Sequence, residues 1–177
     1  LYVTGNPDIV NIDGLIGIRE VPGRMLHVSS NASLENIHGL VNLTRVGGSI
    51  RIWNNPYLES LQGLENLNSI GESAGEDYQD LEIRQNTRLR EIDALGGIEN
   101  IDGHLRIQTN NSLQSLYGLN NLRKIGRSLT VTNNYALPTC EAENLVSHIE
   151  TQEGVGGEIN IEGNNDHQSC DETPPPG

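Results

Sequence analysis

The sequence lacks phenylalanine and has few other aromatic side chains. None of the 177 residues is Phe, aromatic residues make up 3% of the chain, and there is a single Trp. The apolar interior must therefore consist of aliphatic side chains. Leu, Ile and Val suit a narrow interior in which they stack in columns, as in a solenoid.

Basic residues and long apolar runs are also scarce. The chain has 11 Lys and Arg against 24 Asp and Glu, which gives a net charge of -13. Nucleic acids and anionic membrane surfaces both attract basic proteins, so this balance argues against either as a partner. No apolar run reaches the length that crosses a bilayer, and we expect no membrane insertion by this segment.

One unit recurs along the chain. In its clearest copy, residues 104–126, a strand with alternating apolar positions is followed by an Asn and then by apolar residues at every third position. A helix would need gaps of three and four instead. The strands open at Leu1, Leu26, Ile50, Leu81, Leu105, Leu129 and Ile159. The intervals of 25, 24, 31, 24, 24 and 30 residues predict a mainly β solenoid of about seven coils, numbered here from these openings.

An Asn occupies the same place in every coil. A carboxamide has two donors and two acceptors, so at an inward corner it can satisfy backbone groups of the turn. We therefore predict a stacked ladder with a structural role rather than a ligand site. Its members are Asn6, Asn31, Asn55, Asn86, Asn110, Asn134 and Asn164.

The interval of 31 residues contains an acidic insertion at residues 72–80. It carries Glu72, Glu76, Asp77 and Asp80. Clustered oxygen atoms are what calcium requires, but the spacing matches no EF-hand. A solvated surface loop is the favoured interpretation, and we predict no metal site and no cofactor.

The period breaks after Leu137. The following stretch predicts a helix with Thr139 as its N-cap, which lies across the open end of the core. Its apolar stripe consists of Ala142, Leu145, Val146 and Ile149. Cys140 and Cys170, the only cysteines, flank this region. A disulfide is favoured over a free thiol or a zinc pair, because no further Cys or nearby His completes a zinc ligand set.

These patterns divide the chain into three parts. Residues 1–137 form the repeat coils, 138–171 form a disulfide-closed cap of a helix and a last rung, and 172–177 begin a Pro-rich linker. Because the chain starts directly on a strand and ends in this linker, we expect it to be a module of a longer exported protein.

The repeat LxIxxNxxLxxIxGLxxLxxIxG, over residues 1 to about 137, resembles the receptor L domain. This leucine-rich module occurs in insulin- and growth-factor-receptor ectodomains, fungal cell-wall proteins and bacterial surface proteins. The ending from Leu137 to Cys170 is more similar to the bacterial secreted members. The resemblance implies a right-handed parallel β-helix, an extracellular location and a role in binding or cell-surface organisation. The cysteine-rich modules of the animal receptors are absent from this sequence.

The outward positions of the strands supply the candidate ligand-binding surface. Because stacked coils lie about 4.8 Å apart, outward side chains of neighbouring coils can contact the same ligand. The candidates surround the only Trp and are Trp53, Arg51, Arg84, Arg106, His27 and Gln108. Trp with neighbouring Arg is a common hot-spot combination. The alternative is that Arg51 and Arg84 pair with Glu82 and only stabilise the sheet.

We predict a non-catalytic extracellular module that binds a protein or a carbohydrate at the cell surface. No nucleophile triad, metalloprotease, P-loop or GxSxG motif occurs in the sequence. A purely structural spacer or surface-organising domain is the main alternative. A polysaccharide-active β-helix enzyme is a minor one, since no acidic cluster accompanies the arginines in the two outward columns.

Overall fold

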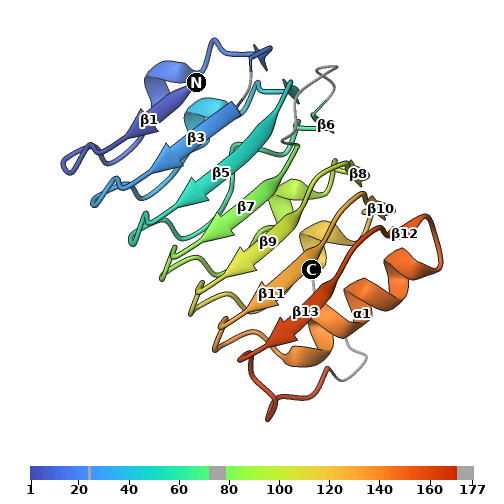
Figure 1. Cartoon of the computed structure of the whole chain (residues 1–177). Helices are drawn as coiled ribbons and strands as arrows, with labels where there is room; N and C mark the ends of the chain where they lie inside the picture. Colours follow the sequence, from blue (N-terminus) through green and yellow to red (C-terminus); the bar gives the residue numbers. More distant parts are fainter. Residues whose placement is uncertain (24, 72–78, 171–177) are drawn as a thin grey trace.

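A seven-stranded parallel sheet forms one wall of the molecule. The computed structural model describes residues 1–23, 25–71 and 79–170 (Figure 1). The strands follow the order β1-β3-β5-β7-β9-β11-β13, one from each coil. They are β1 (Tyr2–Thr4), β3 (Met25–Ser29), β5 (Ser49–Trp53), β7 (Leu81–Arg84), β9 (Leu105–Gln108), β11 (Leu129–Thr132) and β13 (Ile159–Glu162). The predicted parallel β solenoid is confirmed.

Two smaller sheets form a second wall. One contains β2 (Glu20–Val21), β4 (Arg45–Val46) and β6 (Ser69–Ile70), and the other β8 (Asn100–Ile101), β10 (Lys124–Ile125) and β12 (Gly154–Val155). β6 and β8 lie on either side of the break between these sheets. The acidic insertion follows β6 directly in the sequence, so the break in this wall coincides with the extra residues of that coil.

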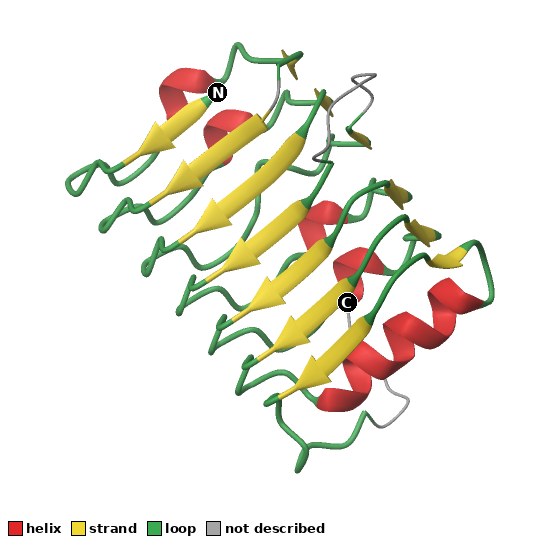
Figure 2. Ribbon diagram, viewed as in Figure 1, coloured by secondary structure: helices red, strands yellow, loops and turns green. Residues whose placement is uncertain are grey.

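A row of short 3₁₀ helices forms the third wall (Figure 2). They are η1 (Asp13–Leu15), η2 (His38–Leu40), η3 (Asp93–Leu95) and η4 (Tyr117–Leu119). The 3₁₀ helix has three residues per turn, which matches the spacing of apolar residues at every third position in these coils. Coil 3 has no such helix between Leu61 and Leu64, and the row is interrupted there.

The core between the walls is aliphatic, as the absence of Phe predicts. In coils 2 to 6 the strand and step-of-three positions are almost all fully buried, for example Leu34, Ile37 and Leu40. Each such side chain contributes about 1.5–3 kcal/mol of transfer free energy. The equivalents in coil 1, such as Ile9 and Leu15, are only partly buried because that coil packs on one neighbour.

The corner after each strand is a left-handed turn that the sequence analysis did not predict. The residue before the ladder Asn has positive φ in all seven coils, between 50° and 69°. Only the first and last of these residues are glycines; the others are Ser30, Asn54, Gln85, Thr109 and Asn133. At Gly126, which closes coil 5, a Cβ would lie 2.3 Å from the Asp102 carbonyl oxygen, so the close approach of the two coils requires glycine there.

The C-terminal cap contains the only α-helix of the described residues, α1 (Thr139–Glu150). The sequence pattern predicts Thr139 as its N-cap, and this prediction is wrong. Pro138 holds that position with extended backbone, and the Thr139 hydroxyl donates to the Asp166 carboxylate instead. Ala142, Leu145 and Ile149 are buried and Val146 is half-buried, so the predicted stripe packs on the core. Among the described residues, no helix has the length and apolar character needed to cross a bilayer.

A disulfide joins Cys140 to Cys170, as the sequence predicts. The Cα atoms are 5.9 Å apart and the two residues are separated by 30 positions. The bond ties the first turn of α1 to the segment that follows β13, so the helix and the last rung are held together covalently.

Candidate functional site

The strand register places the predicted binding residues on one face of the large sheet. In the strand register, His27 of β3 lies beside Arg51 of β5, and Trp53 of β5 lies beside Arg84 of β7. Arg84 then pairs with Gln108 of β9. The six candidates therefore occupy two adjacent columns on four neighbouring strands, as predicted. Whether this face binds a ligand stays a prediction.

Glu82 is the centre of an ion-pair network on this face. Its side chain is 5% exposed and lies within 3.7 Å of Arg51 Nε, 3.6 Å of Arg84 Nε and 3.0 Å of Arg106 Nη1. The three arginine side chains are 24–34% exposed. The arginines therefore pair within the face and remain partly open to solvent.

Asp80 belongs to the same network and is buried, unlike a residue of a solvated loop. One carboxylate oxygen accepts the His104 N–H at 2.8 Å and the other lies 3.3 Å from Arg106 Nη1. Both carboxylate oxygens of Asp80 thus have protein partners. We therefore do not count Asp80 among the ligands of a calcium loop in the insertion. The other acidic residues of the insertion, Glu72, Glu76 and Asp77, lie outside the described residues, within which no three His, Cys, Asp or Glu side chains form a possible metal site.

Trp53 is covered by its neighbours. The Arg84 guanidinium carbon lies 4.4 Å from the ring centroid and that of Arg51 lies 5.4 Å away, distances typical of cation–π contacts. The His27 ring meets the indole edge-on at 5.4 Å. The indole N–H is buried and has no hydrogen-bond partner among the described residues. The indole is therefore held rigidly and offers little free ring face.

His27 continues this aromatic contact toward the first coil. Its ring lies 5.7 Å from that of Tyr2, which is 64% exposed. Burial lowers the pKa of His27 below 6.5, the Arg51 charge lowers it further, and Glu82 opposes both effects. The neutral imidazole is therefore the favoured form at pH 7.

Gln108 links the network to the next strand. Its side-chain oxygen accepts from Arg84 Nη1 at 3.3 Å, and its amide donates to the Thr132 hydroxyl at 3.1 Å. A continuous series of polar contacts therefore crosses β7, β9 and β11, which fixes the rotamers of the exposed side chains.

A second cation–π pair on the same two coils was missed by the sequence analysis. Arg88 lies 4.0 Å from the ring centroid of Tyr57, which is 43% exposed. These residues follow Trp53 and Arg84 by four positions, so coil 3 supplies both aromatic rings and coil 4 both arginines. Tyr57 and Arg88 lie outside the strands, but each comes two positions after a ladder Asn, Asn55 or Asn86. This shared position on neighbouring coils is the signal in the sequence that indicates the pair.

The ladder Asn side chains are structural. Asn110 Oδ1 accepts the Asn86 backbone N–H at 3.1 Å, and Asn110 Nδ2 donates to the Ile83 carbonyl at 2.9 Å. The same pattern continues from coil to coil. The five middle members are fully buried, which keeps them away from any ligand.

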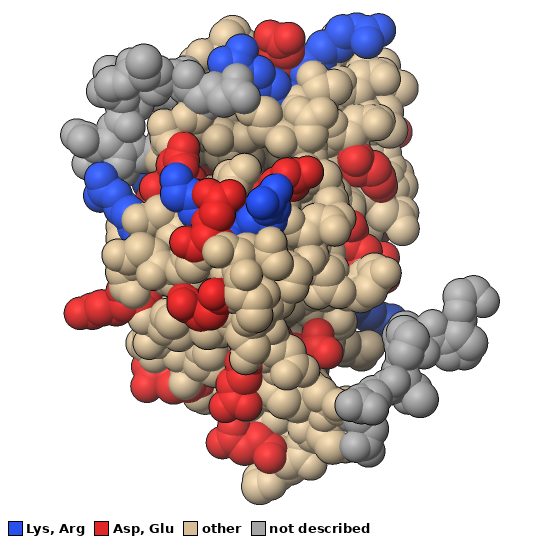
Figure 3. Space-filling view, turned by 90° about the vertical axis from the view of Figure 1, so that its right-hand side faces the viewer, with Lys and Arg blue, Asp and Glu red and all other residues tan. Residues whose placement is uncertain are grey.

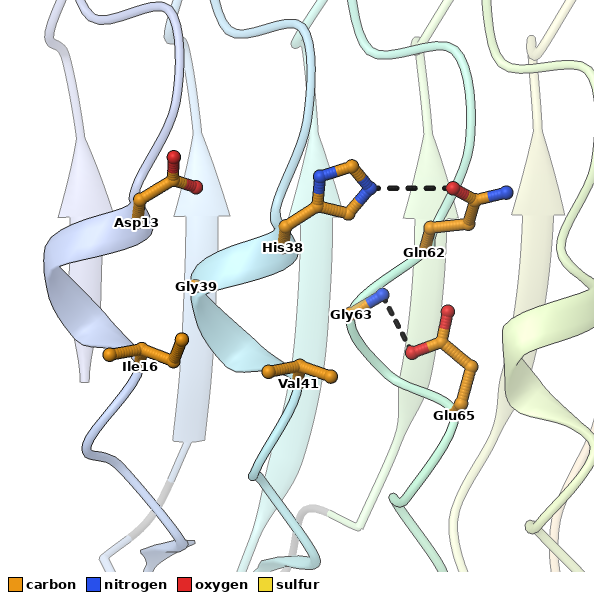
Figure 4. Close-up of a pocket in the computed structure, with 8 residues that line it drawn as sticks. All are labelled: Asp13, Ile16, His38, Gly39, Val41, Gln62, Gly63 and Glu65. Atoms are coloured by element: carbon orange, nitrogen blue, oxygen red, sulfur yellow. Dashed lines mark hydrogen bonds between the residues drawn. The ribbon is translucent and has the colours of Figure 1, made fainter.

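The third wall carries a groove of about 510 Å³ that no sequence pattern indicated (Figure 4). It crosses coils 1 to 3, where the row of 3₁₀ helices ends. Its lining residues are Asp13, Ile16, His38, Gly39, Val41, Gln62, Gly63 and Glu65. Gly63, with φ +111°, lies in coil 3, where the backbone forms no 3₁₀ helix.

Comparison with known proteins identifies the family. No curated protein and no solved structure matches the chain. The family model described as the Receptor L domain matches residues 78–172, which is more than half of the chain. That range includes four strands of the large sheet, β7, β9, β11 and β13, together with the last four ladder residues and the cap. The chain therefore belongs to the Receptor L domain family.

Proposed function

We propose that this chain is an extracellular recognition module that binds a protein ligand through the outward face of β3, β5, β7 and β9. The observation that carries the proposal is the rigid cluster of Trp53, Arg51, Arg84, Arg106, His27 and Gln108 on that face. Receptor L domains are non-enzymatic, typically extracellular modules that bind protein ligands. The disulfide fits an oxidising compartment.

The internal ion pairs support recognition because they reduce its entropic cost. Ordering one flexible side chain at an interface costs about 0.5–1.5 kcal/mol. Arg51, Arg84 and Arg106 are already held by Glu82, so little of this cost remains when a partner binds. Their exposed edges suit carboxylates and backbone carbonyls of a protein ligand.

A protein ligand fits this face better than a carbohydrate. Sugar rings stack on open aromatic faces, whereas Arg84 and His27 cover the ring of Trp53. The second pair, Tyr57 with Arg88, adds an exposed aromatic residue on the adjoining turn of the same coils. Tyr, Trp and Arg are the residues most enriched among protein-binding hot spots.

An array of extracellular proteins, with a glycan array in parallel, tests the proposal. The native chain should bind at least one protein, and Trp53→Ala should weaken that binding by about ten-fold or more, as expected of a hot spot. Tyr117→Ala is the matched control, because Tyr117 is 63% exposed but lies on the third wall. Binding that survives Trp53→Ala would reject this face, and binding to glycans alone would reject a protein ligand.

A structural spacer is the second candidate, and the closed ion-pair network favours it. Glu82 and Asp80 together engage all three arginines of the face, which is how charges would be arranged to stabilise a sheet without a ligand. Failure of the native chain to bind on either array would support this alternative.

A further inference from the structure

The groove on the third wall is lined by two carboxylates and by aliphatic side chains. Asp13, His38 and Gln62 line one edge, and Ile16, Val41 and Glu65 line the other (Figure 4). Ile16 is 56% exposed. No Lys or Arg is among the lining residues. The groove therefore combines carboxylates with exposed aliphatic surface.

Its shape is fixed by the backbone. Glu65 Oε2 accepts the Gly63 N–H at 2.8 Å, and His38 Nε2 lies 3.3 Å from Gln62 Oε1. A Cβ at Gly39 would lie 1.9 Å from the Ile12 carbonyl oxygen, so the coils can approach this closely only with glycine at that position. The backbones of coils 1 and 2 are therefore held close together at the groove, and the Glu65 side chain is tied to coil 3 by its bond to Gly63.

We propose that this groove binds an extended basic segment of a partner protein, with two Lys or Arg side chains placed against Asp13 and Glu65. Charge complementarity points to this occupant, because Asp13 and Glu65 line the groove and no Lys or Arg does. The aliphatic stems of Lys or Arg would pack on Ile16 and Val41, as such side chains commonly do on apolar surface. This site is separate from the face around Trp53.

The positions of the two carboxylates define a spacing for the ligand. Asp13 belongs to coil 1 and Glu65 to coil 3, so they are two coil spacings or about 9.6 Å apart along the stack. They also lie on opposite edges of the groove. In an extended peptide, residues i and i+3 are about 10 Å apart and point to opposite sides. The groove therefore selects basic residues three positions apart.

Fluorescence anisotropy with labelled peptides tests this inference. The probe is an extended valine-rich peptide with two lysines three positions apart; the comparison peptides have the lysines two positions apart or glutamates instead. The first peptide should bind most tightly, and Asp13→Asn or Glu65→Gln should each weaken it by about two- to five-fold, as expected for exposed ion pairs. Gln at position 65 keeps an acceptor for the Gly63 N–H and so preserves the fold.

Two matched variants separate site binding from attraction by net charge. Asp93→Asn removes the equivalent carboxylate in η3, where the row of helices is intact, and Glu59→Gln removes an exposed carboxylate of coil 3 that does not line the groove. Neither should change affinity. Equal losses in all four variants, no preference for the spacing of three, or no binding up to about 1 mM would overturn the inference. Trp53→Ala should have no effect, so the result is independent of the function proposed above.

Discussion

The middle coils and the C-terminal cap are held together in different ways. In the coils, neighbouring copies satisfy each other: buried Asn side chains bond to the next coil, and the arginines of β5, β7 and β9 pair with Glu82. In the cap the period is lost, and a helix and a disulfide take the place of the next coil. A coil is stabilised by its contacts with neighbouring coils, so the end of the stack needs other interactions.

The distribution of charge also differs between the coils and the C-terminal part of the chain. Residues 1–127 hold all 11 Lys and Arg and 15 of the 24 acidic residues, whereas residues 128–177 hold the other nine acidic residues and no basic one. Figure 3 shows Lys and Arg mixed with Asp and Glu mainly in the upper part of one face, and mostly Asp and Glu toward its lower end. The carboxylates of the cap do not neutralise each other, and Glu153 lies 3.9 Å from Arg123 of the preceding coil.

The largest expected effect comes from breaking the ladder in the middle coils. Asn110→Ala leaves the Asn86 N–H and the Ile83 carbonyl buried without partners. Each orphaned group costs about 1–3 kcal/mol, so the free energy of unfolding should fall by about 4 kcal/mol. Denaturant unfolding measures it.

Asn120→Ala is the control for that variant. Asn120 is exposed, and its side chain makes no hydrogen bond within the described residues, so the change should stay within about 0.5 kcal/mol. A loss below about 1 kcal/mol for Asn110→Ala would mean that water replaces the ladder contacts, and the contrast between coils and cap would be weaker than proposed.

Removing the disulfide tests the cap. The double variant Cys140→Ser, Cys170→Ser opens a crosslink between residues 30 positions apart, which the loop-entropy relation values at about 3.6 kcal/mol. Hydrogen exchange should accelerate in α1 and β13 while β5, β7 and β9 keep their protection. Equal acceleration in all these elements would show that coils and cap unfold as one unit.

A smaller effect compares two Glu residues on the same sheet. Glu82→Gln removes the charge that three arginines share and should lower the free energy of unfolding by about 1–3 kcal/mol, because hydrogen bonds to charged groups are worth that much. Glu162→Gln changes an exposed residue of β13 in the cap and should cost less than about 0.5 kcal/mol. Thermal unfolding of the two variants in low and high salt measures both losses. Equal losses of stability in Glu82→Gln and Glu162→Gln would contradict the proposed difference between the middle coils and the cap.

The repeat made most of the fold predictable. Each coil contains the same apolar positions, so the register of all seven strands, the inward Asn and the aliphatic core follow from one pattern. The helix and the disulfide were predictable because the break after Leu137 left an open core that required a cap.

Features set by interactions between coils were not predictable in the same way. Asp80 was assigned to the insertion because its sequence neighbours are acidic, yet Arg106 and His104 from the next coil fix its position. Thr139 is a good N-cap by type, but Asp166 engages its hydroxyl. The positive φ of Gln85 and Thr109 also depends on the stacked corners, since neither residue favours that conformation.

The smallest expected effect is a pH dependence confined to the middle coils. Burial and Arg51 hold the pKa of His27 below 6.5, so at lower pH the unfolded chain binds a proton that the folded chain resists. The contribution of His27 to stability is therefore present above about pH 6.5 and is lost as the pH falls below it. Charged and aromatic neighbours that face it are Arg51, Glu82, Tyr2 and Trp53.

In denaturant unfolding, the wild type should lose stability relative to His27→Gln between about pH 7.5 and 5.5. A gain of the wild type over the variant on acidification would mean that Glu82 controls the imidazole, and that the network stabilises the charged form.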